Sequence, residues 1–339
     1  MNCIRVDIAP KHDRELIRNF PRNTAIERDL GARTAAMNMM ETSPLPTKPA
    51  AIQQAEENLR TLLPTIYSDR PDEVKPVSMG SAPLAFDVDG NVAWDCMWGS
   101  FCDLAMAGGP PHKGKLLEPA TPDSCLAEPV RYATVCDEIS RGIGLAARLQ
   151  ATPSSAMGWM RVQCRNGTMA EWLLRAITME NVSVRIEEDA ILLPAGPAFR
   201  LEKEIKNVIT AVAKTTHYWD GHLIRLQKLG IANLFTLLDN EAPLLQPSWS
   251  TCAENARPED VRRALEDATG LKTTNHNYIN WVGLNCDTVG SAITTMRRMV
   301  ASNILCRREE TTIFLPLNPA DPYGTRLAHS VSELLARDA

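Results

Sequence analysis

The sequence predicts an α+β protein in which one structural unit occurs twice. Residues 158–194 align with residues 280–316 without a gap, at an offset of 122 positions, and eleven of the 37 aligned positions are identical. Helical and strand periodicities alternate in the same order in both segments. A third observation concerns residues 84–94, where Asp89-Gly90 separates two short apolar runs and predicts a hairpin outside the repeated unit.

The identical positions include tryptophan and cysteine, which are rare enough that chance matches are unusual. The eleven pairs are Trp159/Trp281, Cys164/Cys286, Ala170/Ala292, Arg175/Arg297, Asn181/Asn303, Arg185/Arg307, Glu187/Glu309, Glu188/Glu310, Ile191/Ile313, Leu193/Leu315 and Pro194/Pro316. The register also holds upstream, so we interpret residues 131–217 and 253–339 as diverged copies of one unit.

Each copy has the same expected local structure. A short alternating strand, WMRVQC or WVGLNC, precedes a segment of helical spacing, and an asparagine that tolerates the left-handed conformation ends that helix. Two strands joined by a Glu-Glu turn follow, and a proline ends the second strand. With the flanking helices, the unit is helix–strand–helix–strand–strand–helix. Two such units predict one or two paired antiparallel or mixed sheets, with an N-terminal hairpin–helix extension.

The strand–helix–strand–strand core, present twice within 158–194 and 280–316, resembles in topology the duplicated modules of the gyrase-inhibitor-like and SOUL haem-binding proteins. That resemblance implies that the two copies pair into one curved sheet around a small-molecule cleft. It concerns the fold and implies no particular activity.

The predicted domain organisation follows from the repeat. The expected segments are a poorly ordered N-terminal segment and linker (1–50), a helix, hairpin and glycine/proline loop extension (51–130), repeat unit 1 (131–222), a connector (223–252) and repeat unit 2 (253–339). Residues 51–63 have the spacing of an amphipathic helix, whereas the first 36 residues show no apolar periodicity.

Composition excludes several functional classes. Hydrophobic residues make up 44% and charged residues 23%, as in a globular protein, and the net charge of −5 without a basic run argues against nucleic-acid binding. No apolar stretch approaches the length of a membrane span, and the N-terminus does not resemble a secretory signal. Nine cysteines without CxxC pairs indicate reduced thiols, so we expect a cytoplasmic protein without membrane association.

Residues 94–115 are the first candidate for a functional site, because they lie outside the repeat and combine glycines with titratable groups. Asp95, Asp103 and His112 are candidate acid–base residues, and Lys113 and Lys115 would attract an anion. The alternative is an amphipathic helix followed by a solvated basic loop.

The helix expected at 200–222 is richer in ionisable groups than its counterpart in the second copy. His217 is a further acid–base candidate, while Lys206 and His222 are candidate ligand contacts. The alternative for these charges is a solvated helix face. We expect no metal at His217 and His222, because Asp220-Gly221 should break the helix between them.

Two further candidates are Arg175 and Arg297, which recur in both copies and could clamp a carboxylate symmetrically. Capping or an inter-unit ion pair explains their recurrence equally well.

Two functional hypotheses follow. The first is an enzyme doing acid–base chemistry on an anionic metabolite, in a cleft between the repeats and residues 94–115. The second is a non-catalytic small-molecule-binding or regulatory module. Several ionisable groups converging on one pocket would favour the enzyme, and a mainly apolar pocket would favour the binding module. The sequence identifies no cofactor and is compatible with a homo-oligomer.

Overall fold

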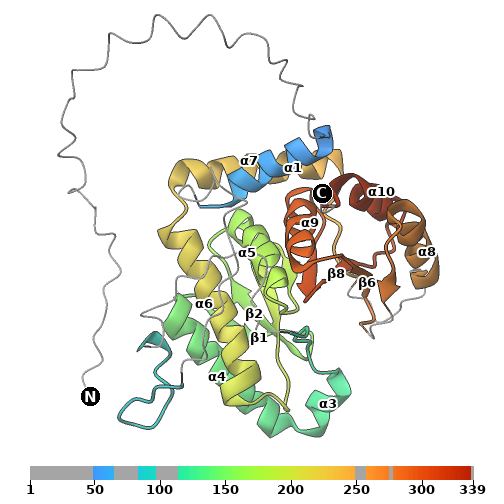
Figure 1. Cartoon of the computed structure of the whole chain (residues 1–339). Coiled ribbons are helices and arrows are strands. Elements are labelled where there is room, and N and C mark those ends of the chain that lie inside the picture. The colour runs from blue at the N-terminus through green and yellow to red at the C-terminus, as the bar shows by residue number, and fades with distance from the viewer. Residues whose placement is uncertain (1–48, 65–82, 97–113, 249–256, 275–277, 337–339) are drawn as a thin grey trace, which may run out of the picture.

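The computed structural model describes residues 49–64, 83–96, 114–248, 257–274 and 278–336. These residues form an α+β architecture with two separate antiparallel sheets of four strands each. Helices pack around both sheets, and the two units lie side by side (Figure 1). No helix within these ranges is long and apolar enough to cross a membrane.

Unit 1 begins with a long helix and contains the sheet ordered β1-β2-β4-β3. Its elements are α4 (Pro129–Ala147), β1 (Ala151–Pro153), β2 (Trp159–Gln163), α5 (Gly167–Met179), β3 (Arg185–Glu187), β4 (Ala190–Pro194), a π-helical turn (Leu201–Ile205) and α6 (Lys206–Gly221).

Unit 2 repeats this plan with the sheet order β5-β6-β8-β7. Its elements are α8 (Pro258–Thr269), β5 (Thr273–Thr274), β6 (Trp281–Asn285), α9 (Val289–Ala301), β7 (Arg307–Glu309), β8 (Thr312–Pro316) and α10 (Thr325–Leu334). The expected α+β class is therefore confirmed. The predicted elements occur in the predicted order, but each unit has one further strand, β1 or β5, that the sequence did not predict. The strands form two sheets, not the one curved sheet that the topological resemblance implied.

The offset of 122 positions holds at the level of single residues. Helices α5 and α9 begin and end 122 positions apart, and so do β2 and β6. The strand pairs share one register, since Trp159 faces Pro194 and Trp281 faces Pro316. This correspondence is what an internal duplication predicts, and a common origin of the two units is an inference from it.

The backbone takes the left-handed conformation at equivalent places in both units. Asn181 and Asn303 have φ of 57° and 62°, and Glu188 and Glu310, in the tight turns, have φ of 54° and 51°. Asparagine tolerates this region because its short polar side chain can hydrogen-bond locally. The expected helix end at each asparagine is thus confirmed.

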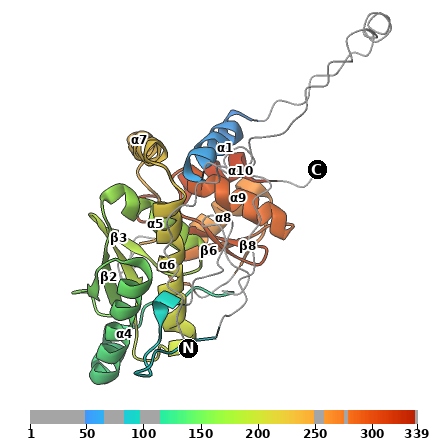
Figure 2. The same cartoon turned by 90° about the vertical axis from the view of Figure 1, so that its left-hand side faces the viewer.

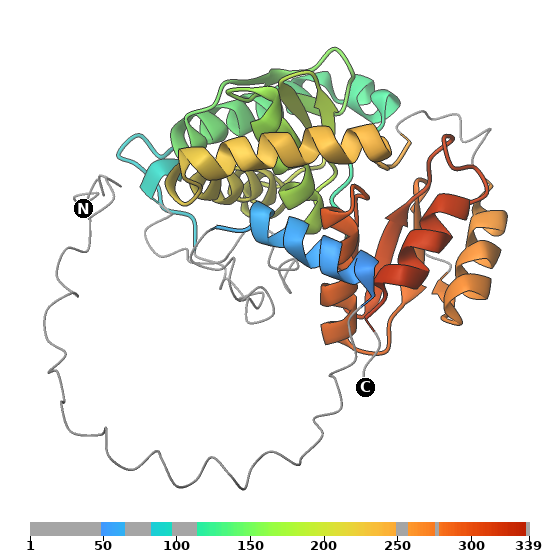
Figure 3. The same cartoon turned by 90° about the horizontal axis from the view of Figure 1, so that it is seen from above.

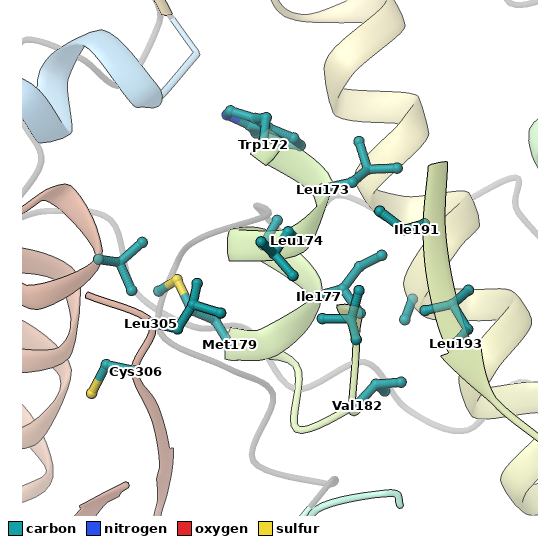
Figure 4. Close-up of a cluster of buried hydrophobic side chains, with 14 of the residues drawn as sticks. Trp172, Leu173, Leu174, Ile177, Met179, Val182, Ile191, Leu193, Leu305 and Cys306 are labelled. Carbon is teal, nitrogen blue, oxygen red and sulfur yellow. The ribbon is translucent and has the colours of Figure 1, made fainter. Parts of the chain in front are cut away.

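Buried side chains of α5 and β4 form the centre of the hydrophobic core (Figure 4). Trp172 is fully buried, and its indole N–H donates to the carbonyl of Leu62, at the end of α1 (Ala50–Leu62). Leu305 and Cys306 of unit 2 appear in the same view and belong to the same cluster of buried side chains as Met179. The core is therefore continuous between the two units.

Helix α1 and the connector tie the units together. Seen from above, α1 lies alongside α7 (Arg225–Glu241) and next to unit 2 (Figure 3). The Asn58 side chain donates to the carbonyl of Ala301 at 3.0 Å, and Arg298 pairs with Glu56 at 2.9 Å. The connector expected at 223–252 is thus largely a helix that packs against α1.

The hairpin expected at 84–94 forms around Gly90, with a bridge between Phe86 and Val92. It joins neither sheet. The short 3-10 helix η2 (Trp94–Cys96) packs on α4, where the Trp94 indole donates to Glu138 at 2.7 Å (Figure 2). Residues 97–113 of the expected helix and loop lie outside the described residues, whereas α3 (Pro122–Ala127) follows within the extension.

Candidate functional site

The acid–base residues expected from the sequence are not brought together by the described part of the chain. Asp103, His112 and Lys113 lie outside it, and Lys115 is exposed. Asp95 is also exposed; the pKa of Arg141 on α4 is raised mainly by its hydrogen bond to Glu138, and the charge of Asp95 adds a little to this. A convergence of His112, His217 and an aspartate therefore stays a prediction.

No contact between His217 and Asp95 is found within the described residues. A β-carbon at Gly142 of α4 would lie 3.1 Å from Trp94 Nε1 and would clash with Ile209, so η2 sits near Ile209 of α6. His217 follows Ile209 by eight positions on that helix. Eight residues of α-helix rise about 12 Å. The described contacts thus place η2 near Ile209, and His217 lies more than two turns further along α6.

His217 and His222 come together at the C-terminal end of α6. Their Nε2 atoms are 3.2 Å apart, and their ring centroids are 5.0 Å apart. Burial lowers the pKa of both imidazoles, and the neighbouring His222 lowers that of His217 further. Helix α6 ends at Gly221, so the end of the helix expected at Asp220-Gly221, between the two histidines, is confirmed.

Arg175 and Arg297 do not form a symmetric clamp. Arg175 is fully buried; it donates to Asn303 Oδ1 at 2.6 Å and lies over the ring of Phe235. Burial lowers the pKa of Arg175 to about 10, although the negative charge of Glu171 acts to raise it. Arg297 instead lies beside α1, in a small recess with Glu56 and Leu59. Lys206 is the first residue of α6, and its side chain is half-buried.

The left-handed asparagines connect the units reciprocally. Asn303 accepts from Arg175 and donates to Asp239 Oδ1 at 2.8 Å and to the carbonyl of Ala242 at 2.9 Å. Asn181 donates to the carbonyl of Arg308 at 2.8 Å and accepts from Arg307 Nη1 at 3.2 Å. The recurring Arg175 thus makes an inter-unit hydrogen bond to a neutral amide, and its ion pair with Glu171 stays within unit 1.

A cation–aromatic contact recurs in the two sheets. The Arg185 guanidinium lies 4.1 Å from the centre of the Trp159 ring. In unit 2 the fully buried Arg307 lies over Trp281 at 5.2 Å and, closer, over Phe314 at 4.1 Å. This pairing explains why the tryptophan and the arginine recur together, which sequence reasoning missed by treating the tryptophan as a strand boundary alone.

The buried Arg307 is held by polar as well as aromatic groups. Its Nη1 donates to Glu309 Oε1 at 2.7 Å, and the same carboxylate oxygen accepts from the Tyr278 hydroxyl at 2.6 Å. That hydroxyl accepts from the backbone N–H of Leu116, which precedes unit 1. Burial and the hydrogen bond to Glu309 raise the pKa of Tyr278.

Beside this cluster, unit 2 contains a pocket of about 340 Å³. It lies between the start of α8, the turn before β6 and the adjoining ends of β6 and β8. Its lining is mainly apolar and aromatic, and consists of Pro258, Arg262, Tyr278, Ile279, Trp281, Val282 and Leu317. Sequence reasoning missed this pocket, because its walls come from segments that are up to 59 positions apart, between Pro258 and Leu317.

Arg262 supplies the positive charge of this pocket. Its Nη1 donates to Glu259 Oε1 at 2.7 Å, but Glu259 is largely exposed. The Arg262 Nε is buried without a hydrogen-bond partner within the described residues. A buried N–H without a partner is stabilised when it gains a hydrogen-bond acceptor. The guanidinium can therefore still bind an anionic group.

The cysteines that recur in both units are packing residues. Burial raises the pKa of Cys164 and Cys286 to about 12, which disfavours the reactive thiolate. Within the described ranges, no group of three or more histidine, cysteine, aspartate or glutamate side chains is placed to hold a metal ion.

No protein-family model, no curated protein sequence and no solved structure matches this chain.

Proposed function

We propose that this protein is a non-catalytic small-molecule-binding module whose ligand occupies the pocket of unit 2. The observation that carries the proposal is the composition of the pocket wall, which has two aromatic side chains, four aliphatic ones and a single cation. A pocket of this kind favours binding over acid–base chemistry, because proton transfer near neutral pH needs groups that titrate there. The raised pKa of Tyr278 moves that hydroxyl further from this range.

The ligand class follows from the same residues. Trp281 and Tyr278 offer aromatic surfaces, Val282 and Leu317 offer apolar ones, and Arg262 offers hydrogen-bond donors for a carboxylate. The volume is at the lower end of the range for small-molecule pockets. A planar aromatic carboxylate of one or two rings combines these features and agrees with the anionic ligand expected from the sequence.

The test compares two ligands that differ only in charge. Isothermal titration calorimetry should detect binding of naphthalene-2-carboxylate, and 2-methylnaphthalene should bind more weakly. Replacing Arg262 by Gln should weaken carboxylate binding about fivefold, because a partly exposed charged hydrogen bond contributes about 1 kcal/mol. Affinity for 2-methylnaphthalene should not change.

Arg263→Gln is the matched control, since Arg263 is the next residue and is largely exposed beside Asp260. This variant should bind both compounds like the wild type. Equal loss in the Arg262 and Arg263 variants would show a nonspecific charge effect. Absence of binding by either compound at millimolar concentration would reject the proposed ligand class.

The acid–base enzyme stays a prediction, because Asp103 and His112 lie outside the described residues and no described contact favours it. A cytoplasmic location remains part of our proposal. It is supported by the six cysteines in the described ranges, all free thiols, and cell fractionation tests it. A homo-oligomer is supported by Leu226, Leu229 and Leu237, which are exposed on α7, and light scattering tests it. The acidic net charge supports the absence of a nucleic-acid partner.

A further inference from the structure

The Nε2 atoms of the two histidines at the end of α6 lie within hydrogen-bond distance of each other. The Nε2 atoms are 3.2 Å apart, whereas the ring centroids are 5.0 Å apart. The rings therefore converge through these nitrogens, and the interplanar angle of 70° excludes a parallel stack. Both side chains are half-buried, so solvent reaches them.

The local backbone accounts for this convergence. Helix α6 runs to Gly221, and the His222 backbone N–H still donates to the carbonyl of Tyr218 at 3.0 Å. The chain then leaves the helix, with Leu223 N–H bonding to the same carbonyl. His222 thus folds back toward His217 five positions earlier. Tyr218 packs against both rings, with ring centroids 5.8 Å from that of His217 and 4.9 Å from that of His222.

The separation of the two nitrogens fits metal coordination. Two imidazole nitrogens, each about 2.05 Å from a tetrahedral zinc ion, are about 3.3 Å apart. We propose that His217 and His222 form a two-imidazole site for a divalent late first-row transition metal of the zinc class, with solvent or a small anion in the remaining positions. The site lies in unit 1 and does not depend on the pocket of unit 2.

The charge state of the histidines supports this proposal. A metal ligand must be a neutral imidazole with a free lone pair, and burial lowers the pKa of both rings, which keeps them neutral near pH 7. Late first-row cations prefer imidazole nitrogen over hard oxygen ligands. The sequence argument against a metal was that the helix ends between the two histidines. The helix does end at Gly221, but the chain beyond it still brings His222 to His217.

The residues around His217 and His222 determine which further groups can coordinate the metal. The Asp220 carboxylate is paired with Arg165, and Lys228 of α7 is close enough for both charges to affect its pKa. Within the described residues no third histidine, cysteine or carboxylate joins the pair as a ligand group. Water or a small anion therefore fills the remaining coordination positions of the proposed site.

The test measures metal binding by the full chain. Zn²⁺ titrated calorimetrically at pH 7.5 should bind the wild type with one more site than His217→Gln/His222→Gln. Each single variant should lose about tenfold or more in affinity at that site, because one of two protein ligands is removed. Glutamine keeps polarity and approximate size, and circular dichroism checks that each variant is folded.

His329→Gln is the control, since His329 is an exposed histidine on α10 beside Glu333. This variant should keep the wild-type zinc stoichiometry, and Zn²⁺ should raise its melting temperature as in the wild type. With Cu²⁺, electron paramagnetic resonance should show hyperfine coupling to two nitrogens, which the double variant loses. Equal zinc binding by the wild type and the double variant would overturn the proposal and leave the pair as a hydrogen bond between two neutral imidazoles.

Discussion

Replacing Asn303 by Ala tests whether the inter-unit asparagines stabilise the fold. Asn303 is buried, has φ of 62° and takes part in hydrogen bonds with Arg175, Asp239 and the carbonyl of Ala242. The substitution removes all three bonds and leaves a left-handed residue without the polar side chain that makes this conformation tolerable.

The expected magnitude follows from these terms. The left-handed conformation costs an alanine about 1 kcal/mol. Loss of the charge-assisted bond from the buried Arg175 costs about 2 kcal/mol, and the two other bonds contribute about 1 kcal/mol together after partial relaxation. We expect Asn303→Ala to lower the free energy of unfolding by about 3–5 kcal/mol, a large fraction of the stability of a typical domain.

Urea denaturation followed by circular dichroism measures this change, and Asn303→Gly separates its two causes. Glycine accepts the left-handed conformation but makes no side-chain bond, so it should be about 1 kcal/mol less destabilising than alanine. Asn240→Ala, at an exposed position of α7, should change stability by less than about 0.5 kcal/mol.

Two outcomes would refute this reasoning. Equal stability of the Ala and Gly variants would show that the backbone conformation at Asn303 contributes nothing. A loss below about 1 kcal/mol for both would show that the hydrogen bonds of the inter-unit contact contribute little net stability.

Two further predictions concern pH and truncation. The folded-state pKa values of His217 and His222 lie below the ordinary value, so the unfolded chain takes up protons first as the pH falls. In buffer with a chelator, the free energy of unfolding should therefore decrease as the pH falls from about 7 through the ordinary histidine pKa of about 6.5. The decrease should be less steep in His217→Gln/His222→Gln. Parallel pH profiles of the wild type and this variant would contradict the prediction. Deleting residues 1–36, which lack apolar periodicity, should leave the melting temperature nearly unchanged. Deleting residues 1–64 should lower it by many degrees, because α1 buries Leu59 and Leu62. A large loss of melting temperature on the shorter deletion would show that the sequence argument missed a packed segment.

Much of the local structure could be predicted because short-range rules govern it. The offset of 122 positions located both units, and the asparagines and Glu-Glu turns were expected at Asn181, Asn303, Glu188 and Glu310. Apolar periodicity identified the helix at 51–63. In each case the physical cause lies within a few residues of its effect, as in capping, turn geometry and the alternation of a strand.

The candidate site was far less predictable. In the sequence, Asp95 and His217 were equivalent candidates because both are titratable. In the structure the charge of Asp95 acts on Arg141, whereas His217 contacts His222. The charge pattern of a helix shows which groups are polar, and not which of them face a neighbouring element.

The sequence by itself determined the α+β class, the two equivalent units and the conformation of their turns, because these depend on residue types at fixed spacings. Only the tertiary structure decided that Arg175 meets Asn303 across the units and that Arg262 and Trp281 line one pocket. Those contacts join residues up to 128 positions apart. Their geometry depends on how whole helices and sheets pack, and packing follows the shape and burial of the complete core, which no local pattern specifies.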